Sequence, residues 1–88
     1  MTVSFYLGTT TVGGTPNYEL RIKIPGSKTA TKRMVNALYL LDNGTRMMGY
    51  VEVAAGGTII ALTKSDAANW TASTDNTEVS GQITFEIN

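Results

Sequence analysis

The sequence predicts one small all-β domain, an antiparallel β-sandwich that spans residues 1–88. Two segments, residues 18–24 and 79–87, alternate apolar and polar side chains with a period of two, which is typical of a strand with one buried face. Fourteen of the 88 residues are threonine, whose branched Cβ packs well on a pleated sheet and restricts the side chain in a helix. Glycine-containing turn signals at residues 42–44 and 54–57 separate further apolar runs.

The two alternating segments are the clearest strands. In the first, Tyr18, Leu20, Ile22 and Ile24 alternate with Glu19, Arg21 and Lys23, and Pro25-Gly26 ends it with a turn. In the last, apolar residues or glycine occupy every second position from Val79 to Ile87. Each segment is therefore expected to place one face in the core.

Residues 47–53 and 58–63 form a predicted hairpin around Ala54-Ala55-Gly56-Gly57. Both strands carry apolar residues on both faces, whereas a surface strand of an isolated sandwich would expose one of those faces to water. A domain that packs against copies of itself explains this pattern. The candidate subunit-interface residues are Met48, Tyr50, Ile59 and Ala61.

Residues 34–41 are ambiguous. As a helix they would align Met34, Leu38 and Leu41 on one stripe, with Gly44 as the stop. We favour a strand, because Lys32 and Arg33 would lie at the positive end of a helix dipole and because the run lies among strands. Asp42-Asn43-Gly44 is then a hairpin turn. Residues 8–17 and 25–33 are expected to be long loops, and residues 75–78 a hydrogen-bonded turn.

Size and charge favour self-association. A chain of 88 residues buries about 60 to 65 percent of its unfolded surface, so its core is marginal. Cysteine and histidine are absent, so neither a disulfide nor the usual zinc ligands can reinforce it. The net charge is zero, but residues 1–46 carry +4 and residues 47–88 carry −4. Copies could therefore be complementary to one another, although a chance distribution explains the asymmetry equally well.

The residues suggest binding rather than catalysis. Without histidine or cysteine, the common nucleophile and base arrangements cannot form, and we assign no catalytic residue, cofactor or metal. Nucleic acid is not expected as a partner, and no apolar run is long enough to enter a membrane. The start of the chain lacks signal-peptide features, which favours synthesis in a cytoplasm. Candidate partner contacts are Lys28, Lys32, Arg33 and Trp70, with a solvated loop and a core tryptophan as the competing interpretations.

The last third of the chain carries a family resemblance. Gly56-Gly57-Thr58, Trp70-Thr71-Ala72-Ser73-Thr74 and Val79-Ser80-Gly81-Gln82-Ile83-Thr84-Phe85-Glu86-Ile87 together resemble the C-terminal β-sandwich of tailed-phage fibre and appendage proteins. They are also similar to small phage head-fibre or capsid decoration proteins. Residues 18–53 share only the strand pattern.

The resemblance implies a jelly-roll-like homotrimer on the virion surface, made in the host cytoplasm, that attaches to a surface instead of turning over a substrate. Its partners would be copies of itself and either other virion proteins or a host-surface glycan. The sequence shows no elongated stalk segment of the kind expected before a fibre tip, so a fibre tip and a decoration protein are both kept as expectations. A free-standing carbohydrate-binding module is the alternative from another class, and it requires exposed aromatic side chains.

Overall fold

The computed structural model describes residues 1–87 and contains six strands. They are β1 (Thr2–Val12), β2 (Glu19–Lys23), β3 (Met34–Asp42), β4 (Thr45–Val53), β5 (Ile59–Lys64) and β6 (Ser73–Thr84), with a single 3-10 turn, η1 (Pro25–Ser27), after β2. Within the described residues no α-helix forms. The all-β prediction is confirmed.

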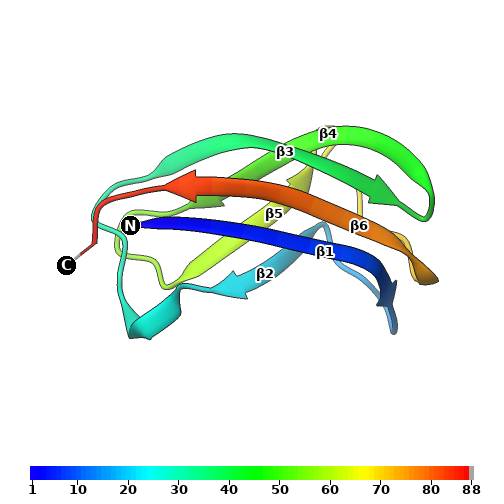
Figure 1. Cartoon of the computed structure of the whole chain (residues 1–88), viewed down its shortest axis with the longest axis horizontal. Coiled ribbons are helices and arrows are strands. Elements are labelled where there is room, and N and C mark those ends of the chain that lie inside the picture. Colours follow the sequence, from blue (N-terminus) through cyan, green and yellow to red (C-terminus); the bar gives the residue numbers. More distant parts are fainter. Residues whose placement is uncertain (88) are drawn as a thin grey trace.

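All six strands belong to one antiparallel sheet in the order β1-β6-β3-β4-β5-β2. The sheet curls into a half-barrel, with β1 and β2 at its two free edges (Figure 1). The two-sheet sandwich expected from the sequence is not confirmed, because five antiparallel pairings join all six strands into one sheet.

The ambiguous segment is a strand, β3, which lies between β4 and β6. Its hairpin with β4 turns at Asn43 and Gly44, which have φ values of 49° and 80°. Both residue types tolerate the left-handed region that a two-residue hairpin turn needs. The second predicted hairpin is also present, since β4 pairs with β5 from Val53↔Ile60 to Gly49↔Lys64.

Two predicted loops are partly strand. β1 continues through residues 8–12, and β6 begins at Ser73, so that the segment expected to be a turn at 75–78 lies within it. Both strands bend where their register shifts, and Thr9 and Asp75 adopt positive φ values there. A cross-strand contact holds the bend, because the Thr11 hydroxyl donates to Asp75 Oδ1 at 3.0 Å and accepts from the Asp75 amide. Such bulges break the period-two pattern that predicts strands.

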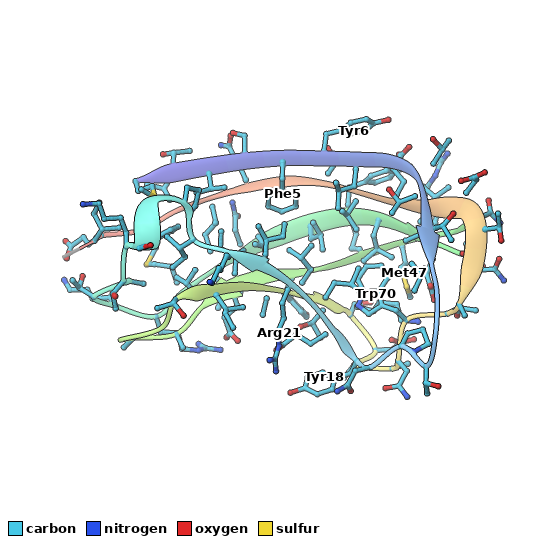
Figure 2. All side chains as sticks on the ribbon, turned by 90° about the horizontal axis from the view of Figure 1, so that it is seen from below. Phe5, Tyr6, Tyr18, Arg21, Met47 and Trp70 are labelled. Atoms are coloured by element: carbon cyan, nitrogen blue, oxygen red, sulfur yellow. The ribbon has the colours of Figure 1, made fainter. Side chains whose placement is uncertain are left out.

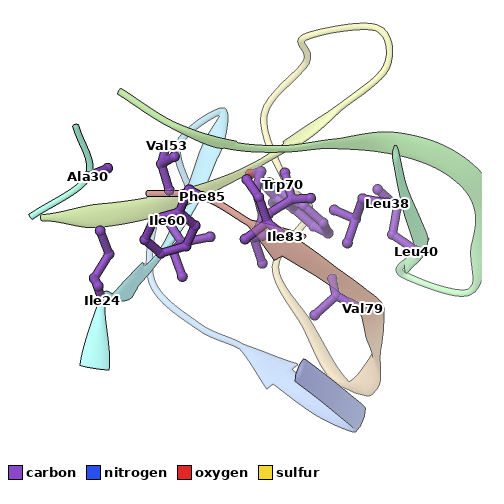
Figure 3. Close-up of a cluster of buried hydrophobic side chains, with 12 residues drawn as sticks. Ile24, Ala30, Leu38, Leu40, Val53, Ile60, Trp70, Val79, Ile83 and Phe85 are labelled. Atoms are coloured by element: carbon purple, nitrogen blue, oxygen red, sulfur yellow. Dashed lines mark hydrogen bonds between the residues drawn. The ribbon is translucent and has the colours of Figure 1, made fainter. Parts of the chain in front are cut away.

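The core fills the concave side of the sheet (Figure 3). Alternate residues of β3, β4, β5 and β6 point into it, and Trp70, from the connection between β5 and β6, packs among them. The buried apolar residues are Ile24, Ala30, Leu38, Leu40, Val51, Val53, Ile60, Leu62, Trp70, Val79, Ile83 and Phe85.

The half-barrel remains open between its two edge strands. In Figure 2, Phe5 points from β1 toward the interior, whereas Tyr6 points away from it. An open groove of about 320 Å³ lies along this side, and its apolar lining is Leu7, Val12, Leu20, Ile22, Leu62 and Val79. Apolar surface is therefore accessible from the side that the strands do not close.

Candidate functional site

The convex face of β3 and β4 carries exposed apolar side chains. Val35, Met48 and Tyr50 have 44%, 55% and 51% of their surface exposed. The strand register places Val35 opposite Glu52, which lies two residues from Tyr50 on the same face of β4, and Met48 lies two residues further along. We call Val35, Met48 and Tyr50 the outer patch. The alternation that buries Val51 and Val53 forces Met48 and Tyr50 to the opposite face.

Two further predicted interface residues, Ala61 and Ile59, lie on β5, two and four residues along the strand from Thr63, which pairs with Tyr50. Ile59 is 36% exposed, at the start of the strand. Ala61 is only 9% exposed and lies between Glu52 of β4 and Arg21 of β2. The structure thus places Met48, Tyr50 and Ile59 at the surface of the single chain, whereas Ala61 offers little area to a partner.

A shallow hollow of about 400 Å³ adjoins the outer patch. Its lining comes from four strands and the two segments that precede β2 and β3, and comprises Tyr18, Glu19, Arg33, Val35, Tyr50, Glu52 and Thr63. An ion pair joins Arg33 to Glu52 within this lining. The hollow therefore combines two tyrosine side chains with groups of both charges, a mixture that suits binding of polar ligands or partners. The sequence predicted Tyr18 on the buried face of a strand, but it precedes β2 and is 46% exposed. Val35 was not predicted at this site, although period-two alternation places it on the face of Ala37.

The three cations among the candidate partner contacts, Lys28, Lys32 and Arg33, differ in their ion pairs. Arg33 pairs with Glu52, and the Lys32 ammonium lies 3.8 Å from a Glu86 carboxylate oxygen at an exposed site. Lys28 is exposed and has no ion pair among the described residues. The positive charge of this loop is consequently balanced in part by carboxylates from β4 and from the segment after β6.

Trp70 does not present its ring to a partner in this structure. It is 2% exposed, and its indole N–H donates to the Leu62 carbonyl oxygen at 3.3 Å. Its partner-contact assignment is therefore corrected to the competing one, a core tryptophan. The physical reason is size: a small half-barrel needs one large side chain to fill its concave side.

A buried ion pair lies at the end of the core. The Lys64 ammonium donates to Asp42 Oδ2 at 2.7 Å, and both side chains are over 90% buried. Thr71 adds its amide to Oδ1 at 2.8 Å and its hydroxyl to Oδ2 at 2.9 Å. Burial by itself would raise the pKa of Asp42, but the hydrogen bonds from Lys64 and Thr71 outweigh it and hold that pKa below its usual value.

This pair has a structural role. Each oxygen of Asp42 accepts hydrogen bonds, and no polar side-chain atom within the buried part of the described chain lacks a partner. The network ties the end of β3 to the end of β5 and to the connection that carries Trp70. It fixes the segment that covers one end of the core.

No group of three or more His, Cys, Asp or Glu side chains between residues 1 and 87 is arranged to hold a metal ion. Over the same residues, no helix has the length and apolar character needed to cross a membrane.

Comparison with known proteins adds no relative. No family model matches the chain, and no significant match was found among curated proteins or solved structures.

Proposed function

We propose that this chain is a non-enzymatic virion structural protein that acts as a homotrimer on the particle surface. It would serve either as a fibre-tip attachment domain or as a capsid decoration protein, as the resemblance of its last third implies. The observation that carries the proposal is the outer patch, an apolar surface on a sheet face that a monomer would leave in water.

The outer patch supports self-association for two reasons. Burying it would add apolar area to a domain whose own core is small. In addition, the patch lies at the middle of a sheet, where the outer faces of neighbouring copies can stack about 10 Å apart. Met48, Tyr50 and Ile59 would contribute most of the interface.

The loop that contains Lys28, Lys32 and Arg33 is the proposed attachment surface. Three copies would repeat these cations around one axis, so that contacts weak in one subunit combine through multivalency. The partner would carry acidic groups, as a host-surface glycan or an acidic patch on a capsid does. Because Arg33 and Lys32 already have carboxylate neighbours, Lys28 is expected to contribute most to the net attraction.

The proposal is tested by replacing Lys28, Lys32 and Arg33 together by Ala and measuring binding to intact host cells and to capsids that lack the protein. Loss of binding to one of the two targets would identify attachment or decoration. Arg21→Ala removes an exposed cation from β2, outside this loop, and is the matched control. If the triple variant folds and binds both targets as the parent does, this loop is not the attachment surface.

A carbohydrate-binding module is the second candidate, and the hollow beside the outer patch favours it. Tyr18 and Tyr50 can stack on sugar rings there, while Glu19, Arg33 and Glu52 can accept or donate hydrogen bonds to hydroxyl groups. Titration of the protein with soluble neutral and acidic polysaccharides tests this. The module interpretation predicts that Tyr18→Ala abolishes binding and leaves the subunit number unchanged.

A further inference from the structure

The two free edges of the sheet differ in how they are protected. β2 carries a charge at three of its five positions, Glu19, Arg21 and Lys23, and Pro25 follows shortly after it. Charges and proline on an edge strand oppose pairing with another chain. β1 has eleven residues and neither a charge nor a proline. Its only protection is the bulge after Leu7, which leaves residues 2–7 as a regular open edge.

The backbone groups of that edge can be assigned. Met1 and Phe85 exchange both of their backbone hydrogen bonds, at 2.7 and 2.9 Å. In an antiparallel ladder, alternate residues direct their N–H and C=O groups to the same side. Val3 and Phe5 therefore face β6, whereas Thr2, Ser4 and Tyr6 direct theirs to the open side. All three of these residues are exposed, and Tyr6, at 66%, is the most exposed large apolar side chain of the described chain.

We infer that β1 pairs with β1 of a second copy, antiparallel and about a two-fold axis at Ser4. This register places Thr2 opposite the partner's Tyr6 and Ser4 opposite the partner's Ser4, and each pair exchanges two backbone hydrogen bonds. No like charges meet, because the segment has none. Residues 2–7 are also rich in β-branched and aromatic types and contain no glycine, a composition typical of strands that add to a sheet.

The second copy also accounts for the open groove. With a two-fold axis perpendicular to the sheet, both half-barrels curl toward the same side of the combined sheet. Each copy then lies beside the open side of the other. Val3 then lies opposite the partner's Phe5 on the inner face, which continues the apolar surface beyond β1. Leu7, which is 42% exposed at the groove, gains apolar neighbours. The same partner therefore forms hydrogen bonds with the free backbone groups of β1 and covers apolar side chains at the groove.

This contact is separate from the proposed trimer, because β1 and β4 lie three strands apart in the sheet. The two contacts can be removed one at a time. Ser4→Lys places like charges opposite each other across the two-fold axis. Tyr50→Asp places a charge in the outer patch. Gln82→Lys is the matched control for Ser4→Lys, since Gln82 is exposed on β6 directly beside Ser4.

Light scattering at several protein concentrations gives the subunit number. We expect Ser4→Lys to halve the mass of the assembly, both in the parent background and in the Tyr50→Asp background. Gln82→Lys should leave the mass unchanged in both backgrounds. Equimolar mixing of Ser4→Lys with Ser4→Glu should restore the parent mass, because opposite charges then face each other. A failed trimer proposal would instead appear as an unchanged mass in Tyr50→Asp while Ser4→Lys still halves the mass.

Residue-resolved amide hydrogen exchange provides the second readout. The amides of Ser4 and Tyr6 should become protected as the protein concentration rises, whereas those of Val3 and Phe5 should be protected throughout. The pairing is overturned if the Ser4 and Tyr6 amides exchange like those of a short peptide at every concentration, or if Ser4→Lys keeps the parent mass. Growth of Tyr50→Asp, in which the trimer contact is removed, into particles of unlimited size would overturn the two-fold arrangement, because a two-fold contact alone stops at two copies.

Discussion

At the scale of single residues, the buried Asp42–Lys64 ion pair depends strongly on the geometry of its hydrogen bonds. Two charges removed from water stabilise a fold only when their partners are close and well oriented, and removing one partner leaves an uncompensated buried charge. Here Lys64 and Thr71 together satisfy both carboxylate oxygens. The pair therefore determines how the ends of β3 and β5 meet. Its net contribution to the free energy of unfolding is smaller than the cost of removing one partner.

Replacing Asp42 by Asn should destabilise the protein strongly. The Lys64 ammonium would remain buried without its counter-charge, which costs about 3–5 kcal/mol in comparable buried pairs. Urea unfolding followed by circular dichroism measures the change. The double variant Asp42→Asn, Lys64→Met should recover much of the loss. Glu19→Gln, which breaks the exposed pair with Arg21, is the control and should change stability by less than about 1 kcal/mol.

The same pair predicts a pH dependence. The pKa of Asp42 in the folded protein lies below its usual value of 3.8, so its stabilising effect is complete above that value. As the pH falls through 3.8 toward the folded pKa, the carboxylate becomes protonated and this contribution to the free energy of unfolding is lost. Unfolding curves should show the parent and Asp42→Asn converging in stability over this interval. A constant difference down to the lowest accessible pH would contradict the assignment.

Period-two alternation in the sequence also indicates where this pair lies. Lys64 continues the inward positions Ile60 and Leu62, and Asp42 continues Leu38 and Leu40. Alternation alone thus places both charges on the core face. What the sequence could not reveal is that the two strand ends lie two strands apart at the same end of the sheet, because this depends on the pairing order.

At the scale of elements, prediction succeeded where the period of two is unbroken or where turn residues mark a hairpin. β2, the β3–β4 hairpin and the β4–β5 hairpin follow from alternation and turn residues. It failed at residues 8–12 of β1 and at the start of β6, where glycine, threonine and bulges replace apolar alternation. Val3, Phe5 and Leu7 do alternate with polar residues, but no strand was predicted there. Those segments are strands because they pair with each other over most of their length, and this long-range contact has no local signature.

Gly49 provides a test of packing within the sheet. A Cβ atom at this position would lie 2.8 Å from Leu40 Cδ2 and would press against the Thr63 carbonyl oxygen. Gly49→Ala should therefore reduce the free energy of unfolding by about 1–3 kcal/mol, the usual effect of overpacking. Gly13→Ala is the matched control, because nothing lies within 4 Å of its Cβ position. Equal stability of the two variants in thermal unfolding would show that β4 and its neighbours are less tightly packed than described.

At the scale of the whole molecule, the half-barrel could not be derived from the sequence. Alternation indicates which face of a strand is buried, but closure into one sheet or two depends on which strands share hydrogen bonds. The two-sided apolarity of β4 and β5 predicted apolar side chains on the outer face, and the structure exposes Met48, Tyr50 and Ile59 there but buries Ala61. Val35, the third member of the outer patch, was not predicted. The central claim is that copies of the chain cover the outer patch.

Light scattering on the parent, Tyr50→Asp and Gln82→Asp at micromolar concentration tests that claim most directly. Gln82→Asp introduces the same charge on the same face of the sheet, two strands away from Tyr50, and is the control. We predict that the parent and the control share a mass that is a multiple of three chains of 9.4 kDa each, and that Tyr50→Asp falls to one third of it or unfolds. A parent that remains a folded monomer at this concentration would contradict the account.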